Sequence, residues 1–461
     1  MGSQRYDYRS IKSIQRQNYE PKENYFSSFA ALLSNTAGVT VMLMPKLFYQ
    51  AGVISGVIQI ISIAFLAYIA GAQLCLAGKA TKSKTFYEIT SLAFGRYHMI
   101  PNISYFILLV GNIICYHTFV LKNLVPLLIY LFDLGYKPGT RSYIMFAIGI
   151  TTIVHMMILP FLFSRKLKLV KQLTTICSAA ILKGVVVIIA VYFAPSYFGM
   201  TEKMVDWDLI ELFKFDGLYV SIGYYLLSYC FHLSVLDIAV EMYPPTTKAT
   251  NLVLLANCTA AAVIYLIVSF TGYLTIFTED NLASMTNYVT FLIINLGKNS
   301  VLLYVANFLV IFSVIFANIL NYVPMIKYLN HELNQKPISF SKRKIDYQSG
   351  DSLADFEFTT DDDRSKYKKR NRIIVSISSA LVYLLHVLIV AKSVRLDVIF
   401  DFVGALCGPP VLLVMPGLFT LFILKNDLVE DASHKDFFWG YFLIIVGAAI
   451  WIFCVYGFFK I

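Results

Sequence analysis

The chain has 461 residues, of which 58% are hydrophobic and 14% charged, and its mean hydropathy is +0.67. A soluble domain holds about 45–50% apolar and about 25% charged residues, so this chain has too few charges to cover a surface exposed to water. Its apolar residues form runs of about 20, which is the length that crosses a hydrocarbon core of about 30 Å. These properties predict a multi-spanning protein of the lipid bilayer. The net charge is +10, but the basic residues do not form a patch of the kind that binds nucleic acid.

Eleven apolar segments follow one another along the chain, and we expect each of them to be a transmembrane helix. Residues 1–24 form a polar and basic cytoplasmic tail, so the membrane domain is expected to cover residues 25–461. Most of the segments are apolar on every face, so periodicity does not show which face is buried. The sequence therefore predicts an all-α integral membrane fold with eleven transmembrane helices. They are expected near residues 26–50, 53–78, 101–131, 141–163, 171–194, 217–242, 250–277, 299–329, 372–394, 397–424 and 437–459.

Two segments between the expected helices do not span the bilayer. Residues 85–95 form an amphipathic stretch that we expect to lie on the inner membrane surface. Residues 332–371 are polar and charged, which predicts a disordered cytoplasmic loop between the eighth and ninth helices. The seven cysteines lie in or beside apolar runs without metal-ligand spacing, so we expect reduced, packed cysteines and no metal site.

Lysine and arginine are distributed unequally between the two sides of the expected bundle. With the N-terminus in the cytoplasm, 27 of the 38 lie in cytoplasmic segments and nine lie on the opposite side. Cytoplasmic loops carry the excess of these residues, so we expect a cytoplasmic N-terminus and an extracellular or lumenal C-terminus. The sequon Asn102-Ile103-Ser104 is then cytoplasmic and is expected to be unmodified. The sequence does not favour the plasma membrane over a vacuolar or lysosomal membrane.

Small and polar residues interrupt two of the expected helices, and we interpret these interruptions as the substrate site. Non-helical backbone at membrane depth is tolerated only where it is buried in protein or lines a cavity. The breaks occupy the first and sixth helices, which fits two inverted five-helix repeats with half-helix ends facing the substrate. The residues of the two breaks are Asn35, Thr36, Ala37, Gly38, Val39 and Thr40 in the first helix, and Ser228, Tyr229, Cys230, Phe231 and His232 in the sixth.

Short motifs occur in a fixed order over residues 25–455. They are GVTVMLMP from Gly38 to Pro45, followed by Gln50-Ala51-Gly52; YCFHLSVLDIAVEMYPPTTKATN at 229–251; Gly272-Tyr273-Leu274-Thr275; and FVGA at 402–405, followed by Pro416-Gly417. In this order and spacing they resemble the amino acid/auxin permease family, most closely its neutral and vacuolar amino acid transporter branches.

The resemblance implies an eleven-helix inverted-repeat carrier that moves amino acids, works as a monomer, and uses sodium ions or protons and no other cofactor. Four positions depart from the family pattern. Thr40 stands where the family has a second glycine, and Asn35 lies one residue closer to Gly38 than its family counterpart. Lys46 after the proline is unusual, and Asp237 occupies a position that is often proline. These departures bear on which substrate is carried.

Two residues bear on the ion that drives transport. Lys183 lies twelve residues after Lys171, about 18 Å along the fifth helix at 1.5 Å per residue and so near the midplane. A lysine there forms a structural ion pair, or its ammonium replaces a bound sodium ion, as in similar proton-driven folds. Residues 314–318 of the eighth helix lack the Ser or Thr of sodium-coupled members, although Ser313 is adjacent. Both observations favour proton coupling over sodium coupling.

Three titratable residues lie at or after the second break. His232 can serve as a proton relay or can shape the cavity through hydrogen bonds. Asp237 can pair with Lys183 or Lys46, and the sequence does not distinguish the two. Glu241, nine residues after His232, is expected to be an inner gate or a solvated residue at the helix end.

An amino acid carrier that works by alternating access fits the two breaks best. Small polar residues from Asn35 to Thr40, with Tyr224, Tyr225 and Tyr229 nearby, favour a neutral amino acid. The alternative is a sensor that binds amino acids and signals through residues 332–371. The sequence contains no HExxH, GxSxG or P-loop motif, so we do not expect an enzyme. A channel is disfavoured because broken helices enclose a central site and not a continuous pore.

Overall fold

The computed structural model describes residues 25–163, 182–194, 210–242, 246–275, 301–332, 361–394, 396–426 and 434–460. Within these ranges the chain is helical and forms no β-strand, which confirms the all-α prediction. In the same ranges nine helices are long and apolar enough to cross a membrane, or ten if a bent pair counts as one span. The expected fifth helix is described only over Leu182–Phe193, so the predicted total of eleven extends into residues outside these ranges.

The first span is broken in the structure. Helix α2 (Tyr25–Thr36) is followed by the 3-10 helix η1 (Val39–Leu43) and by α3 (Met44–Ala51). The two halves of the span are bent by 44°. Pro45 lies in the first turn of α3, where its missing N–H removes no intrahelical hydrogen bond. A proline in this position therefore favours the start of the second half-helix.

The next three long helices are continuous, namely α4 (Val53–Thr81), α6 (Met99–Leu131) and α7 (Arg141–Phe163). The short helix α5 (Phe86–Phe94) lies between α4 and α6, where the sequence predicts an amphipathic interfacial segment. Asn102 of the sequon lies inside α6 with its side chain buried, and its Nδ2 donates to Glu332 Oε1 over 2.9 Å.

The sixth span is also broken. The 3-10 helix η5 (Phe215–Gly217) leads into α9 (Leu218–Ser228), and α10 (His232–Glu241) follows after three residues. No glycine or proline lies between α9 and α10, so local sequence alone does not produce this interruption. Contacts with other helices hold this interruption in place.

The remaining helices complete the bundle. Helix α15 begins at Asp361, eleven residues before the expected 372, so the prediction of a disordered loop is wrong for residues 361–371. The stretch 361–371 contains no proline or glycine, and its charged residues are good or acceptable helix formers that water can solvate beyond the membrane. The remaining helices of the bundle are α11 (Thr247–Thr275), α14 (Val301–Glu332), α15 (Asp361–Ala391), α16 (Leu396–Leu406), the π-helix η7 (Pro410–Val414), α17 (Met415–Lys425) and α18 (His434–Lys460).

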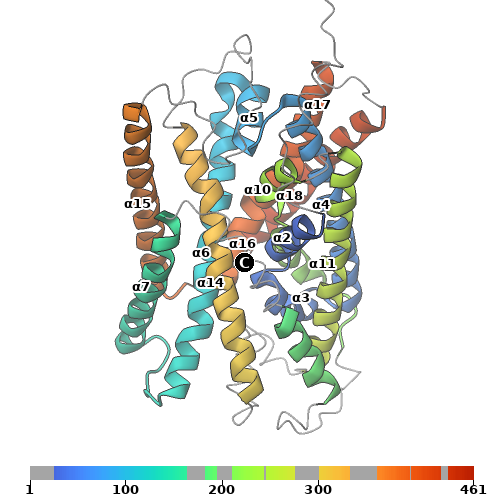
Figure 1. Ribbon diagram of the computed structural model, residues 1–461. Coiled ribbons are helices and arrows are strands. Elements are labelled where there is room, and N and C mark those ends of the chain that lie inside the picture. The colour runs from blue at the N-terminus through green and yellow to red at the C-terminus, as the bar shows by residue number, and fades with distance from the viewer. Residues whose placement is uncertain are drawn as a thin grey trace, which may run out of the picture.

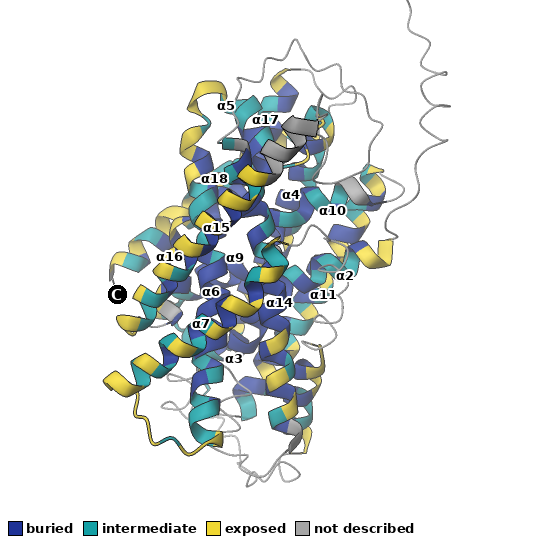
Figure 2. Ribbon diagram, turned by 60° about the vertical axis from the view of Figure 1, so that its left-hand side comes forward, coloured by how far each residue is buried: buried dark blue, intermediate teal, exposed yellow. Residues whose placement is uncertain are grey.

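Helices α6 and α14 pack against each other in the middle of the molecule, with α7 and α15 on one side and α4 and α11 on the other (Figure 1). Buried residues concentrate on the central helices, whereas exposed residues lie on the outward faces of helices such as α7, α15 and α18 (Figure 2). Large apolar side chains such as Ile58, Met156 and Ile452 are exposed there. A lipid-facing surface accounts for this exposure, since hydrocarbon chains solvate such groups.

Candidate substrate-binding site

The two breaks face a small cavity at the centre of the bundle. About 20 Å³ of it can be reached by the centre of a water molecule, which is room for about one or two waters. An amino acid therefore enters only after the surrounding helices move apart. Within the part of the chain that the structure describes, none of the side chains that line the cavity is acidic or basic. They are Asn35, Thr36, Val39, Thr40, Asn112, Tyr116, Leu227, Cys230, Leu233, Ser234, Asn321, Pro324 and Phe400.

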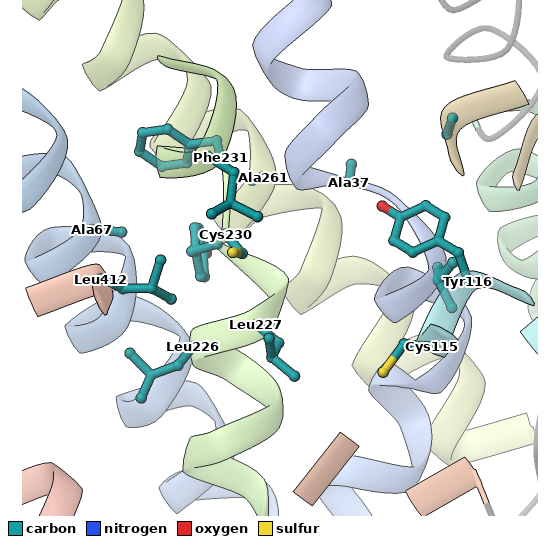
Figure 3. Packing of buried hydrophobic residues seen from close by; sticks show 14 of the residues in the cluster. Ala37, Ala67, Cys115, Tyr116, Leu226, Leu227, Cys230, Phe231, Ala261 and Leu412 are labelled. Carbon is teal, nitrogen blue, oxygen red and sulfur yellow. The ribbon is translucent and has the colours of Figure 1, made fainter. Parts of the chain in front are cut away.

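Tyr116 of α6 closes one side of the cavity against the first break. Figure 3 shows its ring beside the break, near Ala37, with its hydroxyl directed toward the broken span. A Cβ atom added to Gly38 would overlap the Tyr116 hydroxyl. Glycine at position 38 therefore lets this ring lie against the backbone where the first span is unwound.

Hydrogen bonds join the two breaks directly and through a third helix. Asn35 Nδ2 donates to Ser234 Oγ over 2.8 Å, which links the first span to α10. The Tyr265 hydroxyl of α11 lies 2.6 Å from the carbonyl oxygen of Thr36 and 2.7 Å from that of Ser228. These carbonyls belong to the last residues of α2 and α9, where a helix has no partners of its own. The hydroxyl of one buried tyrosine thus lies within hydrogen-bonding distance of the carbonyl oxygens at both helix ends.

The structure brings some of the predicted binding residues to the cavity and places the others behind it. Asn35, Thr36, Val39, Thr40 and Cys230 line the cavity. Thr40 therefore contributes a side chain where the family pattern has a glycine. The predicted residues that do not line it are Ala37, Gly38, Ser228, Tyr229, Phe231 and His232.

The residues behind the cavity hold the second break in place. The Tyr229 ring packs edge-on against Tyr265, with ring centroids 5.2 Å apart. Phe231 stacks on His232 at 4.4 Å and contacts α4 at Gly71, where a Cβ atom would be 2.9 Å from the Phe231 ring. Aromatic packing against α4 and α11 therefore accounts for an interruption that lacks glycine and proline.

Several lining residues were not predicted from the sequence. Asn112 and Asn321 carried a usable signal, because polar residues within spans mostly face the bundle interior. The apolar members carried no signal, since residues of their type occupy every face of these helices. The missed residues are Asn112, Tyr116, Leu227, Leu233, Ser234, Asn321, Pro324 and Phe400.

A second cavity adjoins the first on the side of α5 and α10. Leu233 and Pro324 line both cavities and so lie between them. The second cavity also contains Asp237 and Lys327, whose Oδ1 and Nζ atoms are 2.8 Å apart. Asp237 therefore pairs with Lys327 of α14, and the expected pairing with Lys183 or Lys46 is wrong. His232 lines this second cavity.

The other predicted coupling and gating residues lie away from the central cavity. Lys183 is exposed, whereas a Cβ atom on the next residue, Gly184, would face Val310 and Met42. One residue is about 100° of helix rotation, so the inward face of this helix passes through Gly184 and not through Lys183. Ser313 is fully buried in α14 but does not line the cavity. Glu241 is the last residue of α10, and its side chain lies outside the part of the chain that the structure describes.

Broken spans around a central cavity occur in secondary transporters. The sequence profile of a family described as "Transmembrane amino acid transporter protein" matches residues 21–460. The chain belongs to this family of multi-pass membrane transporters, which confirms the resemblance found in its motifs. No curated protein sequence matches the chain.

Two solved structures share the fold. One is a Na⁺-coupled sialic acid symporter in a substrate-bound, outward-open state, with a TM-score of 0.55, 13% identity, and coverage of 96% of this chain and 90% of the other. The other is Mhp1, a nucleobase-cation-symport-1 family transporter in a closed conformation with bromovinylhydantoin bound, with a TM-score of 0.51, 12% identity, and coverage of 95% and 93%. At these identities the similarity concerns the fold alone.

Proposed function

We propose that this protein is a secondary active amino acid transporter that works as a monomer, without enzymatic activity, by alternating access around the central cavity. The observation that carries the proposal is the small central cavity between the two broken spans. Breaks in the first and sixth spans fit two inverted five-helix repeats in a chain of eleven helices. The cavity is too small for an amino acid in this conformation, so binding requires the helices around it to rearrange.

A neutral amino acid is the proposed substrate. Among the described residues, the cavity lining contains no acidic or basic side chain, and a charged substrate side chain would lie there without a counterion, at a high cost in desolvation. The α-carboxylate and ammonium of an amino acid can interact with helix ends instead. Leu233 and Ser234 belong to the first turn of α10 and line the cavity, and the N-terminal end of a helix favours a carboxylate.

Protons are the proposed coupling ion. Residues 314–318 of α14 contain no Ser or Thr, leaving Ser313 as the nearest hydroxyl for a sodium ion. Titratable groups adjoin the central cavity instead, because His232, Asp237 and Lys327 line the second cavity next to it. Lys183 is exposed in this conformation, so its participation in coupling would require the fifth span to rotate toward the break.

Uptake into liposomes tests these proposals. The purified protein is reconstituted and given a radiolabelled amino acid mixture under an inward proton gradient, an inward sodium gradient, or neither. We expect uptake driven by the proton gradient. Uptake driven only by sodium would leave the carrier and contradict proton coupling. The Lys183→Ala variant, measured in parallel, shows whether this ammonium takes part.

A sensor is the second candidate. Once the helices have rearranged, the cavity could hold an amino acid without releasing it on the other side, and residues 332–371 would then carry the signal. Absence of uptake under every gradient, together with a substrate-dependent rise in melting temperature, would favour the sensor over the carrier.

A further inference from the structure

One wall of the central cavity carries amide and hydroxyl groups. It is formed by Asn112 and Tyr116 of α6 and by Asn321 of α14. Asn112 and Tyr116 are four residues apart in one helix, so their side chains lie on the same face. The broken spans, Pro324 of α14 and Phe400 of α16 form the rest of the lining. The amides of the polar wall thus come from the two continuous helices, and the amide of Asn35 on the opposite side is bonded to Ser234.

A contact behind the polar wall fixes the two helices relative to each other. Asn318 Nδ2 of α14 lies 2.6 Å from His117 Nδ1 and 3.3 Å from the carbonyl oxygen of Ile113. These two partners directly follow Tyr116 and Asn112 in α6. Asn321 lies three residues after Asn318, or about one turn of helix. The contact therefore anchors α14 to α6 at the level of the wall.

The chemistry of the polar wall matches a carboxamide. An asparagine amide offers two N–H donors and a carbonyl acceptor, and a tyrosine hydroxyl can donate and accept. The α-amino and α-carboxyl groups, which all amino acids share, are provided for at the ends of the broken helices. The polar wall is then left to contact the substrate side chain. A carboxamide side chain satisfies these donors and acceptors, whereas an aliphatic side chain of the same size leaves them unpaired.

We propose that Asn112, Tyr116 and Asn321 select amino acids whose side chain ends in a carboxamide. This inference rests on the proposed transport function and names its substrate class. Asn318 is a positioning residue, because it acts on the polar wall through the α6–α14 contact. A site built to hydrogen-bond a polar substrate group rejects an analogue that lacks the group far more strongly than an apolar pocket rejects a missing methylene.

A competition experiment with matched amino acids tests the proposal. Asparagine is compared with leucine, and glutamine with methionine, because each pair is similar in size and differs mainly in the amide. We expect the carboxamide member of each pair to inhibit uptake of the radiolabelled amino acid mixture at a concentration about tenfold or more below the concentration at which its apolar partner does so. The same series is run on Asn321→Leu and Asn112→Leu, with Asn426→Leu as the matched control. Asn426 is exposed at the end of α17, away from the cavity.

The two cavity variants should lose the preference for the carboxamide, and the control should keep it. Loss of preference with uptake of leucine retained shows that the variant is folded and supports the proposal. Equal inhibition by both members of each pair in the unaltered protein would overturn the proposal and leave amino acid transport standing. A preference unchanged in both cavity variants would also overturn it. No uptake of any amino acid would overturn the transport function and this inference together.

Discussion

At the scale of single residues, the contact between Gly38 and Tyr116 sets the shape of the cavity. We predict that Gly38→Ala reduces amino acid uptake at least about tenfold, since the added Cβ atom overlaps the Tyr116 hydroxyl and pushes the ring into the small cavity. The measurement is uptake into liposomes over a range of substrate concentrations. The protein should remain folded, because a tyrosine side chain can shift more easily than a packed backbone.

A second change in the same protein separates this steric effect from a backbone effect. In Gly38→Ala with Tyr116→Phe the overlapping hydroxyl is gone, and uptake should recover in part. Gly149→Ala serves as the control, because a Cβ atom there meets nothing within 4 Å. A double variant as inactive as Gly38→Ala alone would show that the alanine acts on the unwound backbone and not through Tyr116.

At the scale of helices, Tyr265 connects the two broken spans through a single hydroxyl. A hydroxyl has one hydrogen, so it donates to the carbonyl of Thr36 or of Ser228, or is shared between them. We predict that Tyr265→Phe lowers uptake severalfold and costs about 0.5–1.5 kcal/mol of stability, the net contribution of an ordinary hydrogen bond. Uptake and thermal unfolding measure the two effects. Tyr456→Phe, at an exposed position on α18, should change neither.

The ion pair between α10 and α14 lies in the second cavity, just beyond Leu233 and Pro324. We predict that it keeps that side of the central cavity closed. In Lys327→Met, thiol reagents should then modify Cys230, a lining residue, several times faster than in the unaltered protein. The rate is measured on detergent-solubilised protein, with Cys230→Ser to identify the modified residue. The pair is only partly buried, so its contribution to overall stability is modest.

Exchanging the two charges tests whether the pair itself closes this route. Asp237→Lys combined with Lys327→Asp should return the modification rate of Cys230 toward that of the unaltered protein, because the opposite charges meet again. If the exchanged protein reacted as fast as Lys327→Met, the pairing would not be what limits access. If Lys327→Met reacted no faster than the unaltered protein, Leu233 and Pro324 alone would close the route.

The sequence predicts a helix break where the residues that cause the break lie within a few positions of it. Gly38 and Pro45 mark the first break in the sequence, because backbone preference acts within a few residues. The second break lacks such residues, and packing of Tyr229 and Phe231 on distant helices holds it. The polar wall and the partner of Asp237 were missed because both depend on which helices adjoin α6 and α10. Uniformly apolar helices carry no periodicity that shows this.

At the scale of the whole molecule, the structure describes one conformation, and the alternating access that we propose requires at least two. The proposed cycle opens the cavity to one side of the membrane at a time, so hydrogen bonds between the spans must exchange partners. The bond from Asn35 to Ser234 and the two contacts of Tyr265 cross between elements at the cavity. If opening separates the two broken spans, these are the bonds that it breaks, whereas the α6–α14 contact behind the polar wall can persist.

The distribution of charge over the whole chain predicts the orientation of the molecule in its membrane. Lysine and arginine are three times as frequent in segments on the side of the N-terminus as on the other. Cytoplasmic segments of membrane proteins carry such an excess, so we expect the N-terminus in the cytoplasm. We predict that, in cells made to express the protein in their plasma membrane, a cysteine at the exposed position Lys137, between α6 and α7, is labelled by an impermeant maleimide from outside the sealed cells. A cysteine at the exposed position Lys425, at the end of α17, should react only after the membrane is opened. The native chain gives the background labelling. The reverse pattern would place the N-terminus outside. The Asp237–Lys327 pair would then close the central cavity toward the outside and not toward the cytoplasm.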